Sequence, residues 1–90
     1  MVALELGFVV ATPGALAALE AVGQLPTELL ARHEAGDWGE VGAEDRAENE
    51  LSVRDGFRVL SAYTLRTGVK LWIITEADRS ATTILLPEEY

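Results

Sequence analysis

Residues 57–65 (FRVLSAYTL), 69–75 (VKLWIIT) and 81–87 (ATTILLP) decide the fold of this 90-residue chain. Each run is short, rich in β-branched and aromatic residues, and bounded by turn-forming residues, which is the pattern of a β-strand. The connections between the runs are short enough for hairpins. The C-terminal third is therefore predicted to form an antiparallel three-stranded meander that ends at Pro87, since proline has no N–H for the ladder.

The turn at residues 66–68 (RTG) sets the register of the first hairpin. A three-residue loop, with its glycine in the left-handed conformation, places Tyr63 opposite Leu71 and gathers apolar side chains on one face of the sheet. The predicted core face contains Phe57, Val59, Leu65, Val69, Leu71 and Ile73. The same register sets Arg58 opposite Glu76 as a cross-strand ion pair.

The turn at residues 77–80 (ADRS) predicts a four-residue loop that sets Ile73 opposite Ile84. The other face of the meander, here called the second face, is then also largely apolar. It carries Leu60, Ala62, Trp72, Ile74, Thr83 and Leu85. Because an apolar face of this extent is rarely left open to water, we expect the N-terminal segment or a partner chain to cover part of it.

The N-terminal half is predicted to supply one edge strand and two to three short helices. Thr12 and Pro13 mark the first helix start, as an N-cap residue followed by proline at the first helical position. The expected elements are a strand over 4–11, helices over 12–22 and 25–35, and a third helix or an ordered loop over 43–54. Residues 1–90 are therefore expected to form a single α+β domain, with these elements packed on the meander.

The net charge of −8 is unevenly distributed along the chain. Eight acidic residues and only two arginines lie between residues 34 and 55, whereas basic residues prevail between 58 and 79. A chain of this charge repels polyanions at long range and lacks the positively charged surface of a general nucleic-acid binder.

Composition also limits the kinds of site that the chain can hold. With no cysteine and one histidine, neither a disulfide framework nor a structural zinc site is expected. The chain has no glycine-rich phosphate loop and no nucleophile elbow, and we expect no cofactor and no metal. No apolar run reaches about 18 residues, which excludes a membrane span, and no leader pattern is visible, so we expect a cytoplasmic protein.

Two regions carry candidate functional side chains. His33 is the only histidine and is a candidate general base. The loop at residues 36–39 (GDWG) is interpreted either as a helix stop with Trp38 buried under the sheet, or as a binding loop that holds Asp37 near His33. On the second face, Trp72 and Thr83 are the candidates for contact with a partner.

Residues 9–19 (VVATPGALAAL), 32–39 (RHEAGDWG) and 71–90 (LWIITEADRSATTILLPEEY) resemble a family of small uncharacterised plasmid-associated bacterial proteins, some of which carry a restriction-system label. The resemblance implies a link to mobile elements and brings no established activity. Together with the two apolar sheet faces, it leads us to expect an interaction or regulatory module. Its expected partner is another protein or a second copy of the chain, as a homodimer, rather than nucleic acid.

The order of helices before an antiparallel sheet is also similar to that of the barnase–EndoU–colicin–RelE group of metal-independent ribonucleases. This resemblance implies a second hypothesis, in which a histidine or an acid acts as the base, and cations and hydroxyls on the strands hold the scissile phosphate of RNA. By position, the implied residues are His33 as base, Arg58 and Arg79 as cations, and Ser61 and Thr82 or Thr83 as hydroxyls.

Overall fold

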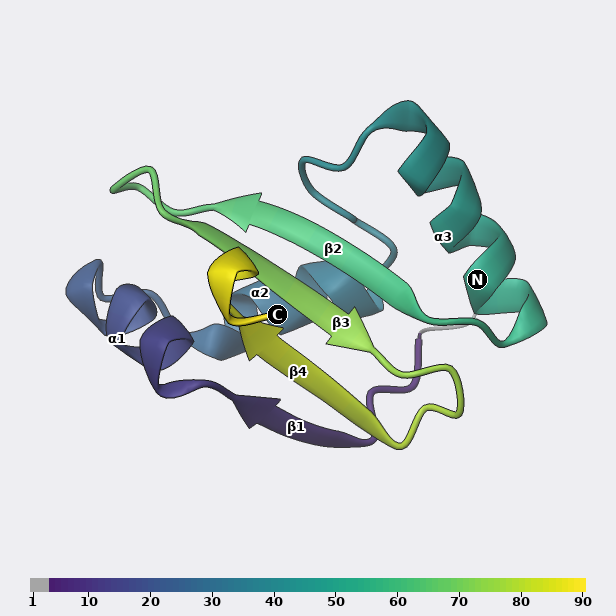
Figure 1. Ribbon diagram of the computed structural model, residues 1–90, viewed down its shortest axis with the longest axis horizontal. Coiled ribbons are helices and arrows are strands. Elements are labelled where there is room, and N and C mark those ends of the chain that lie inside the picture. The colour runs from purple at the N-terminus through teal and green to yellow at the C-terminus, as the bar shows by residue number, and fades with distance from the viewer. Residues whose placement is uncertain (1–3) are drawn as a thin grey trace.

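The computed structural model describes residues 4–90. Its elements are β1 (Phe8–Ala11), α1 (Pro13–Ala21), α2 (Pro26–Glu34), α3 (Ala43–Asp55), β2 (Val59–Thr64), β3 (Lys70–Thr75), β4 (Ala81–Leu85) and the 3-10 turn η1 (Pro87–Glu89) (Figure 1). The expected lack of a leader rests partly on residues 1–3, which lie outside the described residues. Within residues 4–90, no helix has the length and apolar content needed to cross a bilayer.

The four strands form one mixed sheet in the order β1-β4-β3-β2. The meander β2–β3–β4 is antiparallel, and its register confirms both predicted loop lengths, with Tyr63 opposite Leu71 and Ile73 opposite Ile84. The predicted three-stranded sheet was too small, because β1 joins it as a fourth strand. β1 runs parallel to β4, with Phe8 beside Ala81, so the sheet is mixed.

Helices α1 and α2 cover one face of the sheet and enclose the main core (Figure 1). This core consists of Ala15, Leu19, Val22, Leu29, Tyr63, Leu65, Leu71, Ile73 and Ile84. Two predicted members of the core face are wrong: Phe57 is 62% exposed and Val69 is 38% exposed. Both residues lie just outside the strands, where the alternating pattern continues but no helix covers it.

Helix α3 lies beside β2 and covers the outer edge of that strand (Figure 1). The Asn49 side chain donates to the Leu60 carbonyl (2.7 Å) and accepts from the Leu60 N–H (3.3 Å), as a neighbouring strand would. Further along the same edge, the Ala62 N–H donates to the Trp38 carbonyl (3.1 Å), and the Glu40 N–H donates to the Ala62 carbonyl (2.7 Å). The β2 edge of the sheet is therefore closed by the chain itself.

The contact between α3 and β2 gives a first testable prediction. Asn49→Leu is expected to lower the free energy of unfolding by about 2 kcal/mol, because it removes both partners of the Leu60 backbone at a half-buried edge. Urea unfolding measures this loss. Glu48→Leu, at an exposed position of the same helix, is the control and should change stability by less than about 0.5 kcal/mol. Equal effects of the two substitutions would contradict the bridging role.

The second face is covered in part by the C-terminal turn, whereas the N-terminal segment or a partner chain was expected to cover it. The Tyr90 ring packs edge-on against Trp72, with centroids 5.8 Å apart. Arg58 donates to the Tyr90 hydroxyl (2.7 Å) and forms the predicted ion pair with Glu76 (3.2 Å). The N-terminal segment instead lies on the core side, where the Leu6 carbonyl accepts from Thr82.

Candidate functional site

A chain of buried polar groups runs through the core between α2 and the sheet. His33, on the core side of α2, contacts hydroxyl groups from β2 and β3, and a further hydroxyl follows on β4. The members are His33, Ser61, Thr75 and Thr82, and each has an exposed fraction of 0%. Among residues 4–90, no buried side-chain nitrogen or oxygen lacks a hydrogen-bond partner, so this network is fully satisfied.

The directions of these hydrogen bonds follow from the single proton of each hydroxyl. The Thr82 hydroxyl donates to the Leu6 carbonyl (2.7 Å), and so it accepts from the Thr75 hydroxyl (2.8 Å). Thr75 in turn accepts from Nε2 of His33 (2.8 Å), which leaves Nδ1 to accept from the Ser61 hydroxyl (2.5 Å). The network therefore holds His33 in one neutral tautomer, protonated at Nε2.

Burial also opposes a charge on His33. Desolvation, and after it the positive charge of Arg79, lower the pKa of His33 from 6.5 to about 4. The Trp38 ring lies edge-on to the imidazole, with centroids 5.7 Å apart, and closes that side of it. An imidazole that is buried, neutral and bonded at both nitrogens has no free lone pair to offer a substrate.

The structure thus brings together some residues of the ribonuclease hypothesis and separates others. His33, Ser61 and Thr82 are in one network, but they are enclosed in the core. Arg79 donates to the backbone carbonyls of Ser52, Phe57 and Glu76. Arg58 lies with Tyr90 at the second face, where its partners are the Tyr90 hydroxyl and Glu76. This arrangement favours a structural role for the network.

The GDWG loop fits the first of its two interpretations. Trp38 is 1% exposed and donates from Nε1 to Glu50 (3.2 Å), so it is a core residue. Asp37 is exposed and paired with Arg32 (2.7 Å), whose hydrogen bond lowers the pKa of that carboxyl below its usual value. The Tyr63 hydroxyl donates to the Asp37 carbonyl (2.6 Å). The loop therefore ends α2 and joins it to the edge of the sheet.

The two remaining candidates, Trp72 and Thr83, lie on the second face as predicted. Both are half-buried, and Trp72 is partly covered by Tyr90. Thr83 is paired in register with Val10 of β1, so the exposed part of the second face extends onto that strand. No group of three or more metal-ligating side chains occurs within residues 4–90.

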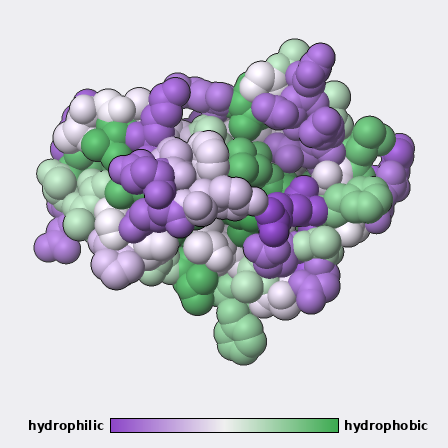
Figure 2. Space-filling model, viewed as in Figure 1, coloured by the Kyte–Doolittle hydropathy of each residue, from purple (hydrophilic) through white to green (hydrophobic). Residues whose placement is uncertain are grey.

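Strand β1 is the most exposed apolar segment of the sheet. The sequence predicted an edge strand here but did not indicate it as a candidate functional site. Phe8 is 82% exposed, Val9 45% and Val10 50%. Apolar side chains project along the lower edge of the molecule, over β1, in Figure 2. The signal for an exposed edge was the lack of a second strand in the sequence that could flank β1 on its other side.

No protein-family model, curated protein or solved structure matches this chain. Both resemblances noted above, and the link to mobile elements, therefore stay predictions. The function has to be inferred from the residues of the chain itself.

Proposed function

We propose that this protein is an interaction module whose open strand β1 (Phe8–Ala11) pairs with a strand of a protein partner, in the simplest case a second copy of the chain. The observation that carries the proposal is the contrast between the two edges of the sheet. The β2 edge is bonded by Asn49 and by residues 38–40, whereas β1 has only β4 beside it in the described part of the chain.

The backbone of β1 supports this role. The Phe8 N–H donates to the carbonyl of Ser80, just before β4, and the Thr12 N–H donates to the carbonyl of Ile84 in β4 (both 3.0 Å). Since successive residues of a strand alternate in direction, the N–H and C=O groups of Val9 and Ala11 point away from β4. A second strand can therefore bond to Val9 and Ala11 without displacing any hydrogen bond of the sheet.

The side chains of β1 support the same conclusion. Monomeric proteins protect open edges with charged residues, proline, a bulge in the strand or a very short strand, and of these β1 has only its length of four residues. Residues 8–11 (FVVA) contain neither charge nor proline. Phe8 and Val10 add their exposed surface to the half-buried Thr83 and Trp72 of the second face. A partner strand at β1 would cover both the free backbone groups and these apolar side chains.

The proposal predicts a concentration-dependent dimer that depends on β1. Phe8→Lys and Val10→Lys are each expected to raise the dissociation constant of the dimer at least about tenfold. A lysine at the paired edge would lose its hydration or lie close to the same lysine of the second chain. Light scattering coupled to size-exclusion chromatography, from about 1 μM to about 1 mM, measures the change.

Phe57→Lys is the control for this measurement, because it removes the other phenylalanine that is largely exposed (62%, against 82% for Phe8) and that lies outside β1. It should leave the association unchanged. A wild-type chain that stays monomeric up to about 1 mM would contradict self-association, and a dimer that Phe57→Lys disrupts as strongly as Phe8→Lys would contradict the role of β1.

A further inference from the structure

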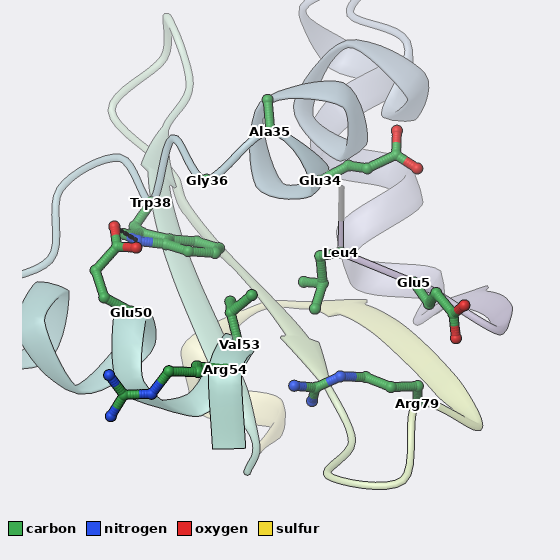
Figure 3. A pocket seen from close by; sticks show the side chains of 10 residues that line it. All are labelled: Leu4, Glu5, Glu34, Ala35, Gly36, Trp38, Glu50, Val53, Arg54 and Arg79. Atoms are coloured by element: carbon green, nitrogen blue, oxygen red, sulfur yellow. Dashed lines mark hydrogen bonds between the residues drawn. The ribbon is translucent and has the colours of Figure 1, made fainter. Parts of the chain in front are cut away.

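The two edges of the sheet decide how two copies of the chain can meet. The β2 edge is unavailable for pairing, because Asn49 and residues 38–40 already bond it. Figure 3 shows Glu50 of α3 beside the Trp38 indole, from which it accepts a hydrogen bond (3.2 Å), so α3 is bonded to the segment that closes this edge. In the part of the chain that the structure describes, β1 is the edge left for a second copy.

A contact that uses β1 on both copies has two-fold symmetry. Contacts between two different edges repeat from copy to copy and grow into a fibre, whereas a contact of one edge with itself closes as a dimer. In a symmetric pair each hydrogen bond occurs twice, with the roles of the copies exchanged. The paired bonds of an antiparallel ladder allow this, and the slanted bonds of a parallel ladder do not. The two β1 strands would therefore run antiparallel.

The backbone of β1 also selects the register of this pair. The outward N–H and C=O groups belong to Val9 and Ala11, since Phe8 and Thr12 bond to the β4 side. All of these outward groups find partners when Val9 lies opposite Ala11 of the second copy. Val10 then lies opposite Val10 of the second copy, at the two-fold axis.

The two neighbouring registers lose hydrogen bonds. With Val9 opposite itself, the next bonded pair would need Gly7, which has a left-handed backbone (φ 64°) and lies outside the strand. With Ala11 opposite itself, the next bonded pair would need Pro13, which has no N–H and belongs to α1. The register centred on Val10 is therefore the one that uses every outward group of the strand.

The apolar side chains of β1 fit the same register. Phe8 and Val10 point to the second face, and their exposed fractions of 82% and 50% are the largest in the strand. Phe8 would lie diagonally across from Val10 of the second copy, within reach of an aromatic ring. On the other side of the sheet, Val9 would face Ala11 of the second copy. The pairing therefore covers apolar surface on both sides of the strand.

The distribution of charge favours a second copy over a charged partner. Residues 8–11 carry no charge, whereas α3, with Glu44, Asp45 and Glu48, lies at the opposite edge of the sheet (Figure 1). The strand spacings between these edges add up to about 14 Å, which exceeds the Debye length of about 8 Å at physiological ionic strength. Two copies with a net charge of −8 each can therefore meet at β1 with their acidic helices far apart.

We propose that the partner of β1 is a second copy of the chain, paired antiparallel with Val10 at the two-fold axis. This inference rests on the proposed function and adds the partner and the register to it. Because neither copy has a second open edge within residues 4–90, association stops at two chains.

Single-cysteine variants report the register directly, because the chain has no cysteine of its own. Cα atoms of residues that face each other at a non-hydrogen-bonded antiparallel position are about 4.5 Å apart, within the range of a disulfide. Val10→Cys is therefore expected to form a disulfide-linked dimer under mild oxidation. Its rate should be at least about tenfold above that of Phe57→Cys, which measures random collisions at an exposed site.

Val9→Cys is the matched control, because Val9 is the neighbouring valine and is 45% exposed, against 50% for Val10. In the proposed register the two Val9 Cα atoms would be about 9 Å apart, too far for a disulfide. Val9→Cys should therefore link no faster than Phe57→Cys. Non-reducing gel electrophoresis of the three oxidised variants gives the comparison.

The outcomes separate this inference from the proposed function. A faster link through Val9→Cys than through Val10→Cys would overturn the register, and wild-type species larger than a dimer in light scattering would overturn the closed pair. If the wild-type chain forms a dimer that Phe8→Lys disrupts, but neither variant links, the antiparallel pair is excluded and the role of β1 stands. A monomeric wild-type chain would exclude the second copy as the partner.

Discussion

Lowering the pH from 7 to 4 is expected to reduce the free energy of unfolding by about 3 kcal/mol through His33 alone. The folded protein holds this histidine neutral, with a pKa of about 4, whereas in the unfolded chain it titrates near 6.5. Unfolding therefore takes up a proton between these two values. The stability due to His33 is complete above pH 6.5, is lost as the pH falls toward about 4, and stays constant below that.

Urea unfolding at pH 7, 6, 5 and 4 measures this loss, and His33→Gln is the control. The variant is expected to be less stable at pH 7, because one amide cannot replace both hydrogen bonds of the imidazole to Ser61 and Thr75. It shares the carboxylates of the wild-type chain, so the difference between the two pH profiles isolates the histidine. Parallel profiles would show that His33 is already charged, or already accessible, in the folded protein.

Gly39→Ala is expected to lower the free energy of unfolding by at least about 3 kcal/mol. Gly39 has φ 72°, and a Cβ at this position would overlap the Ala62 carbonyl oxygen and press on the Tyr63 ring. Since the nearest obstacle is backbone, residues 38–40 would have to leave the edge of β2. The two hydrogen bonds that close this edge would then be lost.

Gly68→Ala is the control for this prediction, because it separates the cost of the steric overlap at Gly39 from the cost of backbone strain. Gly68 also has a left-handed backbone (φ 89°), but an added Cβ meets no atom within 4 Å. It should therefore cost only about 1 kcal/mol, the penalty for a side chain in this conformation. Urea unfolding of both variants gives the comparison, and equal losses would contradict a tight approach of Gly39 to β2.

The meander could be predicted from the sequence because its contacts are local. The glycine at position 68 and the four-residue turn before Ala81 limit the register of each hairpin to one that gathers the apolar side chains. The pairing of β1 with β4 could not be predicted in this way, because no residue near β1 indicates its partner strand. A short apolar strand fits either edge of a sheet equally well. The alternating pattern also misplaced Phe57 and Val69, because it does not show where the covering helices end.

The candidate site was predictable in part of its membership but not in its accessibility. His33, Ser61 and Thr82 were expected, whereas Thr75 was missed, and Arg58 and Arg79 lie outside the network. The register places Ser61, Thr75 and Thr82 on the core side of the sheet, and helical spacing places His33 on the buried face of α2 with Leu29. Whether these groups line a cleft or a closed core depends on how closely α2 and Trp38 pack on the sheet. That packing is a tertiary property, and so the sequence left a catalytic role open beside the structural one.

The pairing of β1 with β4 has a consequence for the way in which the chain is made. Phe8 and its neighbour Ala81 are 73 positions apart, so a ribosome releases β1 long before it has synthesised the strand that β1 joins. The contacts of the β2–β3 hairpin are local in sequence, whereas β1 has no partner strand until β4 is available. During that interval β1 is an exposed apolar segment without a partner strand, which is the kind of segment that a chaperone binds.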